Sequence, residues 1–240
     1  MGRKKEYFLI VDTETCNSIE EPLPYDIGYC ICDRYGNVYL ERSFVVAEIF
    51  CDLSDVMQSA YYAKKIPMYW EDIKSGKKLL RTYRTIRKTV CEDMKNYKVK
   101  KVGAYNASFD RRALNNLSRY VTKSFTRWFF PFGTEYFCIW HMACQVIMAR
   151  KTYIDFAIKN GLISDKGNIF TNAECCYKFL KQNLDFEEEH TGLADVKIET
   201  EILAECYRKH AKMKKNVNPS CWQLVQTKRK ELNAKKKKVA

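Results

Sequence analysis

The stretch Tyr7-Phe8-Leu9-Ile10-Val11-Asp12-Thr13-Glu14-Thr15 has the pattern of a buried strand that ends in two carboxylates. A strand alternates its side chains between two faces, so Phe8 and Ile10 share one face with Asp12 and Glu14. The run is apolar on both faces before the first acid, which predicts a central strand covered on both sides. Two carboxylates about 6 to 7 Å apart on one face repel each other unless cations or donors compensate them. The stretch therefore predicts a divalent-metal site or, as the alternative, a solvated turn.

Composition and cysteine spacing narrow the class of protein. The chain has 240 residues, of which 46% are hydrophobic and 14% aromatic, so it can bury one substantial core. No apolar run approaches the roughly 18 residues of a membrane span, and the N-terminus has no signal-peptide segment. The eleven cysteines include no C-x-x-C pair, which argues against a disulfide framework and against a standard zinc site. We therefore expect a cytoplasmic, intracellular protein with buried reduced thiols.

The positive charge of the chain is concentrated at its C-terminal end. The net charge is +13, and ten Lys or Arg against Glu231 alone place about nine of those units in residues 212–240. We therefore predict a folded domain over residues 1–211 and a basic C-terminal tail over residues 212–240. Such a tail attracts polyanions, nucleic acid above all. The alternative is a solvated tail without a dedicated partner.

Turn and helix patterns organise the middle of the chain. Asp33-Arg34-Tyr35-Gly36-Asn37 predicts a hairpin turn between strands 25–32 and 38–46, so the first three strands form an antiparallel meander. Apolar residues at three- and four-residue spacing predict helices over residues 53–65 and 77–97.

Two segments combine cationic and aromatic residues. The exposed face of the predicted helix 77–97 carries basic residues that suit a phosphate backbone, although a solvated basic face is the commoner explanation. The segment 125–132 packs five aromatic residues around Arg127. Aromatic rings interleaved with cations can stack nucleic-acid bases, and the alternative is a small hydrophobic cluster.

Two further carboxylates stand near the beginnings of helices. The predicted strand 101–105 runs into Asn106-Ala107-Ser108-Phe109-Asp110, where a polar side chain can cap a helix. A late helix begins after His190 with Thr191 as its cap, and Asp195 shares its face with apolar residues. An inward carboxylate needs a metal, a cation or donors opposite it, since unpaired burial costs several kcal/mol. The alternative is that Asp195 bonds only the N-terminus of its own helix.

Taken in order, these motifs resemble the DEDDh exonucleases, the proofreading-exonuclease branch of the ribonuclease H-like fold. The first motif of that family, a strand that ends D-x-E-T, is similar to Asp12-Thr13-Glu14-Thr15. The second, N-x-x-F-D at a strand-to-helix junction, is similar to Asn106-Ala107-Ser108-Phe109-Asp110. The third, H-x-x-x-x-D at the start of a late helix, is similar to His190-Thr191-Gly192-Leu193-Ala194-Asp195. The resemblance extends over residues 6–208.

The resemblance implies an α/β protein with a central mixed sheet, whose first three strands are antiparallel, flanked by helices. It implies a 3′-to-5′ exonuclease in which two divalent cations, Mg or Mn, are held by four carboxylates. Hard oxygen ligands favour Mg or Mn over Zn. The implied general base for the attacking water is His190, because a near-neutral pKa suits that task. The implied metal ligands, which are also catalytic residues, are Asp12, Glu14, Asp110 and Asp195.

The implied substrate is a nucleic acid with a free 3′ end, and single-stranded DNA is the first expectation. Relatives commonly follow the first motif with Thr-Gly, whereas Cys16-Asn17-Ser18 follows here, so the loop near the terminal base differs. Alternatives are an exoribonuclease that trims RNA 3′ ends, a nucleic-acid binding module without activity, and a zinc-binding regulator, which the cysteine spacing disfavours. The residues that the resemblance assigns to substrate binding are Thr13, Thr15 and Asn106.

Overall fold

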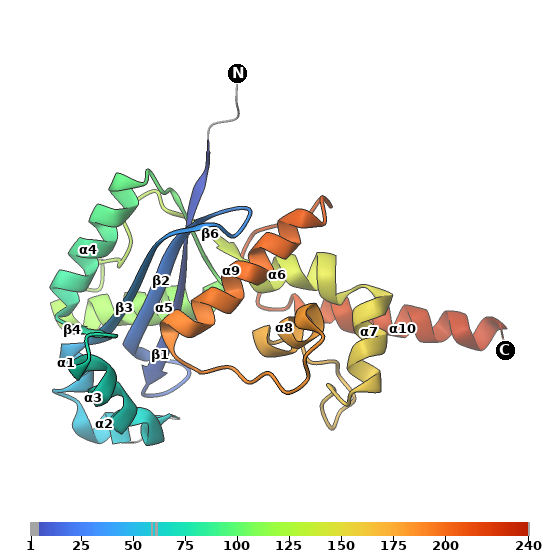
Figure 1. The fold of residues 1–240 in the computed structure, drawn as a ribbon, viewed down its shortest axis with the longest axis horizontal. Coiled ribbons are helices and arrows are strands. Elements are labelled where there is room, and N and C mark those ends of the chain that lie inside the picture. The colour runs from blue at the N-terminus through green and yellow to red at the C-terminus, as the bar shows by residue number, and fades with distance from the viewer. Residues whose placement is uncertain (1–4, 59, 61, 240) are drawn as a thin grey trace.

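The computed structural model describes residues 5–58, 60 and 62–239, and these residues form a six-stranded mixed sheet with helices on both faces (Figure 1). The strands lie side by side in the order β4-β3-β2-β1-β5-β6. Strand β2 is antiparallel to both of its neighbours, β1 and β3, whereas β5 runs parallel to β1 and β6 parallel to β5. The predicted mixed sheet with three antiparallel first strands is therefore confirmed. The strand bounds are β1 (Tyr7–Cys16), β2 (Leu23–Asp33), β3 (Val38–Val46), β4 (Leu79–Arg81), β5 (Lys101–Ala104) and β6 (Glu135–Cys138).

The helices form two layers, one on each face of the sheet. Helices α1 to α5 supply buried side chains to the core on one face, and the elements from α6 to α10 supply the core on the other face. Their bounds are α1 (Ala47–Phe50), α2 (Ser54–Gln58), η1 (Ala63–Lys65), α3 (Ile66–Lys74), α4 (Tyr83–Asn96), α5 (Ala107–Thr122), α6 (Ile139–Ala143), η2 (Cys144–Met148), α7 (Lys151–Lys159), α8 (Ala173–Lys181), α9 (Gly192–Arg208) and α10 (Trp222–Val239).

Strand β1 is the central strand that its sequence predicts. Phe8 and Ile10 are buried in the core beneath α9, and Leu9 and Val11 are buried in the core beneath α5. Because both faces are covered, the strand can leave its polar residues only at its carboxyl end. The acidic motif lies there.

The predicted helix 77–97 is wrong at its N-terminal end. Residues Leu79–Arg81 form strand β4, which pairs parallel with β3, and α4 begins only at Tyr83. Thr82 precedes this helix, and its side-chain oxygen accepts a hydrogen bond from the backbone N–H of Thr85. Helical spacing of apolar residues did not reveal the strand, because its three residues are extended only through their pairing with β3.

The predicted helix 53–65 is also wrong, because it is interrupted. Helix α2 ends at Gln58, a short 3₁₀ turn follows from Ala63 to Lys65, and α3 then begins at Ile66. Pro67 lies in the first turn of α3, where its missing N–H costs nothing and its fixed φ favours a new helix start.

The C-terminal segment is partly built into the body. The backbone N–H of Cys138 donates to the carbonyl of Lys215 (2.9 Å), and Gln226 makes two hydrogen bonds to the backbone of Ile169 (3.0 and 2.9 Å). Val225 is fully buried, and the rest of α10 extends away from the body (Figure 1). The segment 212–240 thus combines a docked first part with a protruding basic helix. The domain boundary after residue 211 stays a prediction.

The cysteines are mostly buried, as the sequence predicts. All eleven cysteines are free, and nine of them are buried, so the predicted reduced thiols are present. Across the described part of the chain, none of the helices is both long and apolar enough to cross a membrane.

Candidate active site

Strand β1 presents its two acids opposite two residues of β2 that also take part in the site. In the antiparallel pairing Asp12 lies across from Gly28, and Glu14 lies across from Asp26. Glu14 is buried, and Asp12 is partly exposed. The register shifts directly after Glu14, at Thr15, so the regular strand ends at the acidic motif.

Asp110 lies in the same region as the two acids of β1. The helix that carries it, α5, covers the face of the sheet opposite to α9. Strand β5 runs parallel to β1, and α5 begins three residues after β5, with Asp110 in its first turn. The Asp110 Oδ1 atom accepts hydrogen bonds from the backbone N–H of Thr13 (3.1 Å) and from the Thr13 hydroxyl (2.9 Å). Thr13, which lies between Asp12 and Glu14, therefore holds Asp110 in place. Asn106 precedes α5 and accepts a hydrogen bond from the Ser108 hydroxyl (2.9 Å).

The beginning of α9 rests directly on the backbone of β2. A Cβ atom added to Gly28 would lie 2.1 Å from the carbonyl carbon of Gly192, and one added to Gly192 would lie 2.5 Å from the backbone nitrogen of Gly28. That second atom would also lie 3.1 Å from the backbone oxygen of Asp12. Only glycine permits this approach. The contact brings Asp195, in the first turn of α9, to the acids of β1.

Asp26 fixes the same helix start by hydrogen bonding. Its Oδ2 atom accepts from the backbone N–H of Gly192 (3.1 Å), from the Tyr69 hydroxyl (2.7 Å) and from Lys78 Nζ (2.8 Å). Asp26 and Lys78 are both buried, so their ion pair is shielded from solvent. The cross-strand partners of both acids, Gly28 and Asp26, thus hold the helix that carries Asp195.

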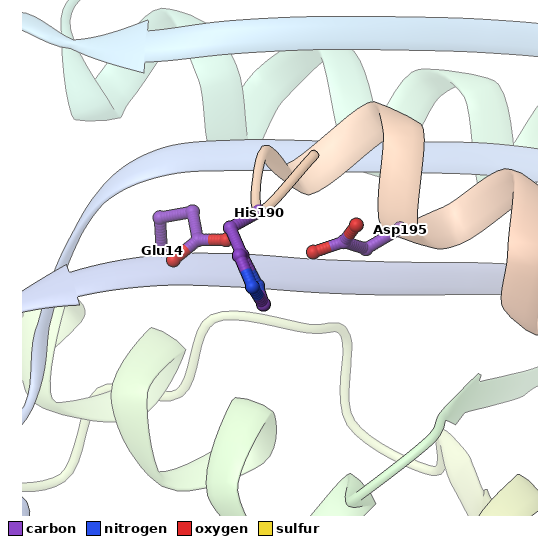
Figure 2. Close-up of side chains that lie close together, drawn as sticks. All are labelled: Glu14, His190 and Asp195. Atoms are coloured by element: carbon purple, nitrogen blue, oxygen red, sulfur yellow. The ribbon is translucent and has the colours of Figure 1, made fainter. Parts of the chain in front are cut away.

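Three of the sequence-predicted residues form one compact group. Ligand atoms of Glu14, His190 and Asp195 all lie within 4.8 Å of one another. Figure 2 shows these side chains together, from β1, from the loop ahead of α9 and from α9 itself. His190 also lies within 4.8 Å of ligand atoms of Glu174 and Glu188, so it stands between two acidic groups.

His190 is held from several sides. Its backbone is left-handed (φ 46°), a conformation that a non-glycine residue adopts only when the surroundings enforce it. Its ring stacks on Tyr62, with ring centroids 4.7 Å apart. The Lys65 ammonium donates to the backbone carbonyl of Glu189 and lies 3.5 Å from that of His190. The segment between α2 and α3 therefore positions the histidine.

The clustered carboxyl groups hold their protons unusually strongly. Burial, together with the charges of Asp195 and Asp26, raises the pKa of Glu14 to about 8. Burial also raises the pKa of Asp110 and of Asp195 to about 7, although Thr13 opposes the first shift and Lys65 the second. The pKa of Asp12 is well above its usual range because of burial and the neighbouring acids. Such a set of acids favours a compensating cation.

The pKa of His190 moves in the opposite direction. Burial lowers it, and the Lys65 cation lowers it further, whereas Glu174 opposes the change. The acidic residues that precede His190 in the sequence suggest the reverse effect, but burial and Lys65 outweigh them. The imidazole is therefore neutral at pH 7 and can accept a proton.

Sequence reasoning missed three carboxylates that belong to this region. Glu199 is buried, and the charges of Asp110 and Asp195 help to raise its pKa. It lies one helical turn after Asp195, so the four-residue spacing was the signal that pointed to it. Burial and Asp195 raise the pKa of Glu188 to about 8. For Glu188 and for Asp26 the sequence offered no periodic signal.

The donor atoms suit a divalent cation. The Asp195 Oδ1 and Glu199 Oε2 atoms are buried and have no hydrogen-bond partner among the described residues. Buried carboxylate oxygens normally have partners, because the unpaired state is costly. The set is rich in hard oxygen ligands, which Mg and Mn prefer.

Thr15 belongs to β1 beyond the register shift, where it lies across from Pro24 and is partly exposed.

The chain is similar in fold to solved structures of E. coli exonuclease I. The structure with a 5cy-dT13 oligonucleotide is 12% identical, with 84% of this chain and 41% of that chain covered and a TM-score of 0.48. The zinc-bound complex with single-stranded DNA is also 12% identical, with 93% and 43% covered and a TM-score of 0.48. This chain thus spans less than half the length of either. No protein-family model and no curated protein matches it.

Proposed function

We propose that this protein is a metal-dependent 3′-to-5′ exonuclease that hydrolyses phosphodiester bonds at nucleic-acid 3′ ends. The observation that supports the proposal most directly is the group of Glu14, His190 and Asp195, with an unpartnered buried oxygen on Asp195. The proposed ligands of two divalent cations, Mg or Mn, are Asp12, Glu14, Asp110 and Asp195. Two such ions, when bound, stabilise both the attacking and the leaving oxygen of an in-line displacement.

His190 is the proposed general base. A neutral imidazole can take a proton from the attacking water, and burial and the Lys65 cation, which lower the pKa of His190, favour that neutral form. The Tyr62 ring and the Lys65 ammonium hold the histidine loop in place. Tyr62 and Lys65, which lie between α2 and α3, therefore contribute to the orientation of the base.

Single-stranded DNA is the proposed first substrate, with substrate contacts from Thr13, Thr15 and Asn106. Thr13 donates to Asp110 through both its backbone N–H and its hydroxyl, so its proposed contact with substrate is additional to its role in holding Asp110. We place the activity in the reducing cytoplasm, where the buried thiols stay unpaired. RNA 3′ ends are the alternative substrate, and a binding module without activity is the alternative class.

The test is a degradation assay on 5′-labelled single-stranded DNA and on RNA of the same sequence. Each is incubated with the protein in Mg, in Mn and in EDTA, beside the Asp12→Ala variant. We expect a ladder that shortens from the 3′ end in Mg or Mn and is absent in EDTA and in Asp12→Ala. Absence of the ladder on both substrates would contradict an enzymatic function, and a ladder on RNA alone would identify an exoribonuclease.

A further inference from the structure

A basic groove lies between α4 and the end of α5, two helices in contact on one face of the sheet (Figure 1). It has a volume of roughly 980 Å³, and its lining includes five cationic and two acidic side chains. The cationic side chains are Arg84, Arg87, Lys88, Lys95 and Arg127.

The two acids of this groove are already engaged. The Glu48 carboxylate accepts two hydrogen bonds from the backbone N–H of Tyr83 at the start of α4 (3.0 and 2.9 Å). Glu92 lies 3.9 Å from Lys88 in an exposed pair of adjacent helical turns. The groove therefore keeps an excess of positive charge, which favours a polyanionic ligand.

A second basic hollow, of roughly 280 Å³, runs along α5, the helix that carries Asp110 in its first turn. Its lining starts at Ser108, two residues before Asp110, and contains three arginines and no acid. One of these, Arg119, has a buried Nε atom without a partner among the residues that the structure describes. Its guanidinium group lies 5.3 Å from the centroid of the Trp128 ring. An unused donor beside an aromatic ring suits a phosphate and its neighbouring base.

Trp128 contacts lining residues of both hollows. The carbonyl of this residue accepts a hydrogen bond from Arg87 Nε (3.3 Å), which lines the groove, while the ring lies against Arg119 in the second hollow. From Asp110 to Thr122 the helix spans about 18 Å, at 1.5 Å per residue. The Phe125 ring, beyond the end of that helix, is 87% exposed. The cations of the two hollows, together with the exposed rings of Trp128 and Phe125, are here called the basic track.

We infer that this basic track binds single-stranded nucleic acid on the 5′ side of the 3′ terminus. The inference rests on the proposed function for its direction, since the end of the strand lies at the acids. Arginine side chains pair with phosphates, and exposed aromatic rings stack on unpaired bases, a combination typical of single-strand binding. The aromatic segment and the basic helix face that the sequence singles out therefore act on the same ligand.

The first test compares two double variants with the same change in charge. Arg84→Glu with Arg127→Glu alters the groove, and Lys159→Glu with Lys166→Glu alters α7 and the turn after it, at the opposite end of the molecule (Figure 1). All four side chains are exposed, so both variants should keep the thermal stability of the parent. Binding is measured by fluorescence anisotropy on a labelled 30-nucleotide DNA, in the Asp12→Ala background, as a function of salt.

We expect the groove variant to bind on the order of 10-fold more weakly, with a salt slope smaller by about 1.4 for two lost phosphate contacts. The control variant should retain most of the affinity. Equal losses in both variants would overturn the inference, because they would show attraction by net charge alone. The assay needs no hydrolysis, so it stands even if the protein is not a nuclease.

The second test uses substrate length. In the catalytically competent background, the groove variant should degrade a dinucleotide as fast as the parent does but lose on the order of 10-fold in kcat/KM on the 30-nucleotide DNA. An equal loss on both substrates would also overturn the inference. Phe125→Ala should weaken the binding of single-stranded DNA several-fold and leave a duplex of the same length unaffected. An unchanged affinity for single-stranded DNA would show that the Phe125 ring is not part of the basic track.

Discussion

The neighbouring strands β1 and β2 each carry a buried carboxylate, and the surroundings of the two carboxylates differ in charge. On β2, the Oδ2 atom of Asp26 accepts from a lysine, a tyrosine and a backbone N–H, so its charge is compensated within the chain. On β1, Glu14 faces other acids, and among the main influences on its pKa Lys65 alone lowers it. The difference separates a structural acid from acids that lack a counter-charge. The second kind indicates a ligand that the chain does not supply.

Removing the internal counter-charge should have the largest effect. Lys78→Ala leaves Asp26 buried without its cation, and we expect a loss of about 3 to 5 kcal/mol in the free energy of unfolding. The matched control is Lys77→Ala, whose side chain is mostly exposed and pairs with Asp72 at 3.5 Å. It should cost less than about 1 kcal/mol. Urea unfolding measures both, and similar losses would contradict the distinction between the two lysines.

The acids of β1 should make the metal-free protein less stable as the pH rises. The pKa values of Glu14, Asp110 and Asp195 lie at about 7 to 8 in the folded state, above the values of about 4 for the unfolded chain. The folded state therefore keeps protons that the unfolded state loses, and stability falls between about pH 4 and pH 8. In EDTA the Tm should be higher at pH 5 than at pH 8.

Added Mn should reverse this trend at high pH. Ligands bind metal in their ionised form, so the affinity for Mn should fall with pH. A Mn concentration of 100 times the Kd at pH 8 should add about 2.7 kcal/mol to the free energy of unfolding at pH 8, and the same concentration should add much less at pH 5. Calorimetry with and without EDTA checks this difference. The same gain at both pH values would show that the clustered acids are not the ligands.

Neutralising Glu14 on β1 and Asp26 on β2 should change the stability of the protein in opposite directions. Glu14→Gln removes a charge that has no internal partner, so the metal-free protein should gain about 1 to 3 kcal/mol at pH 8. Asp26→Asn removes a charge that pairs with Lys78 and should lower stability instead. Thermal melts of both variants in EDTA measure the two effects. If both changes shift the Tm in the same direction, the two carboxylates do not differ in kind.

The smallest effect concerns the histidine. Lys65→Met removes a cation that lowers the pKa of His190, so that pKa should rise. If His190 is the general base, the acidic limb of the pH–rate profile should move to higher pH. Lys64→Met, one residue away, is the control. An unmoved limb would show that a group other than His190 accepts the proton.

Local patterns were enough to find the acids but not what holds them. The two-residue period of a strand placed Asp12 and Glu14 on one face, and helix-start signals placed Asp110 and Asp195 at the beginnings of helices. The supporting contacts depend on residues that are far apart in sequence. The carboxylate of Asp26 meets Tyr69, Lys78 and Gly192, and no local period connects them.

The same reason explains the errors in secondary structure. Leu79–Arg81 became a strand because β3 offers a parallel edge, which the spacing of apolar residues cannot reveal. The contact of Gly28 with Gly192 is equally hidden, since each glycine alone suggests only a turn or a close approach. Sequence reasoning thus reached most of the elements and the acids that cluster at the end of β1, whereas the tertiary contacts that assemble them required the structure.

The contact of Gly28 with Gly192 also fixes the point about which any tilt of α9 would turn. With no side chain between the two backbones, the first residue of the helix has no room to slide. Asp195 lies about 4.5 Å along the helix from this pivot, and Arg208 lies about 24 Å from it. A tilt that moves the far end by about 2 Å therefore moves Asp195 by only about 0.4 Å. The lever geometry isolates the acidic site from rearrangements at the distal end of the longest helix that packs on the sheet.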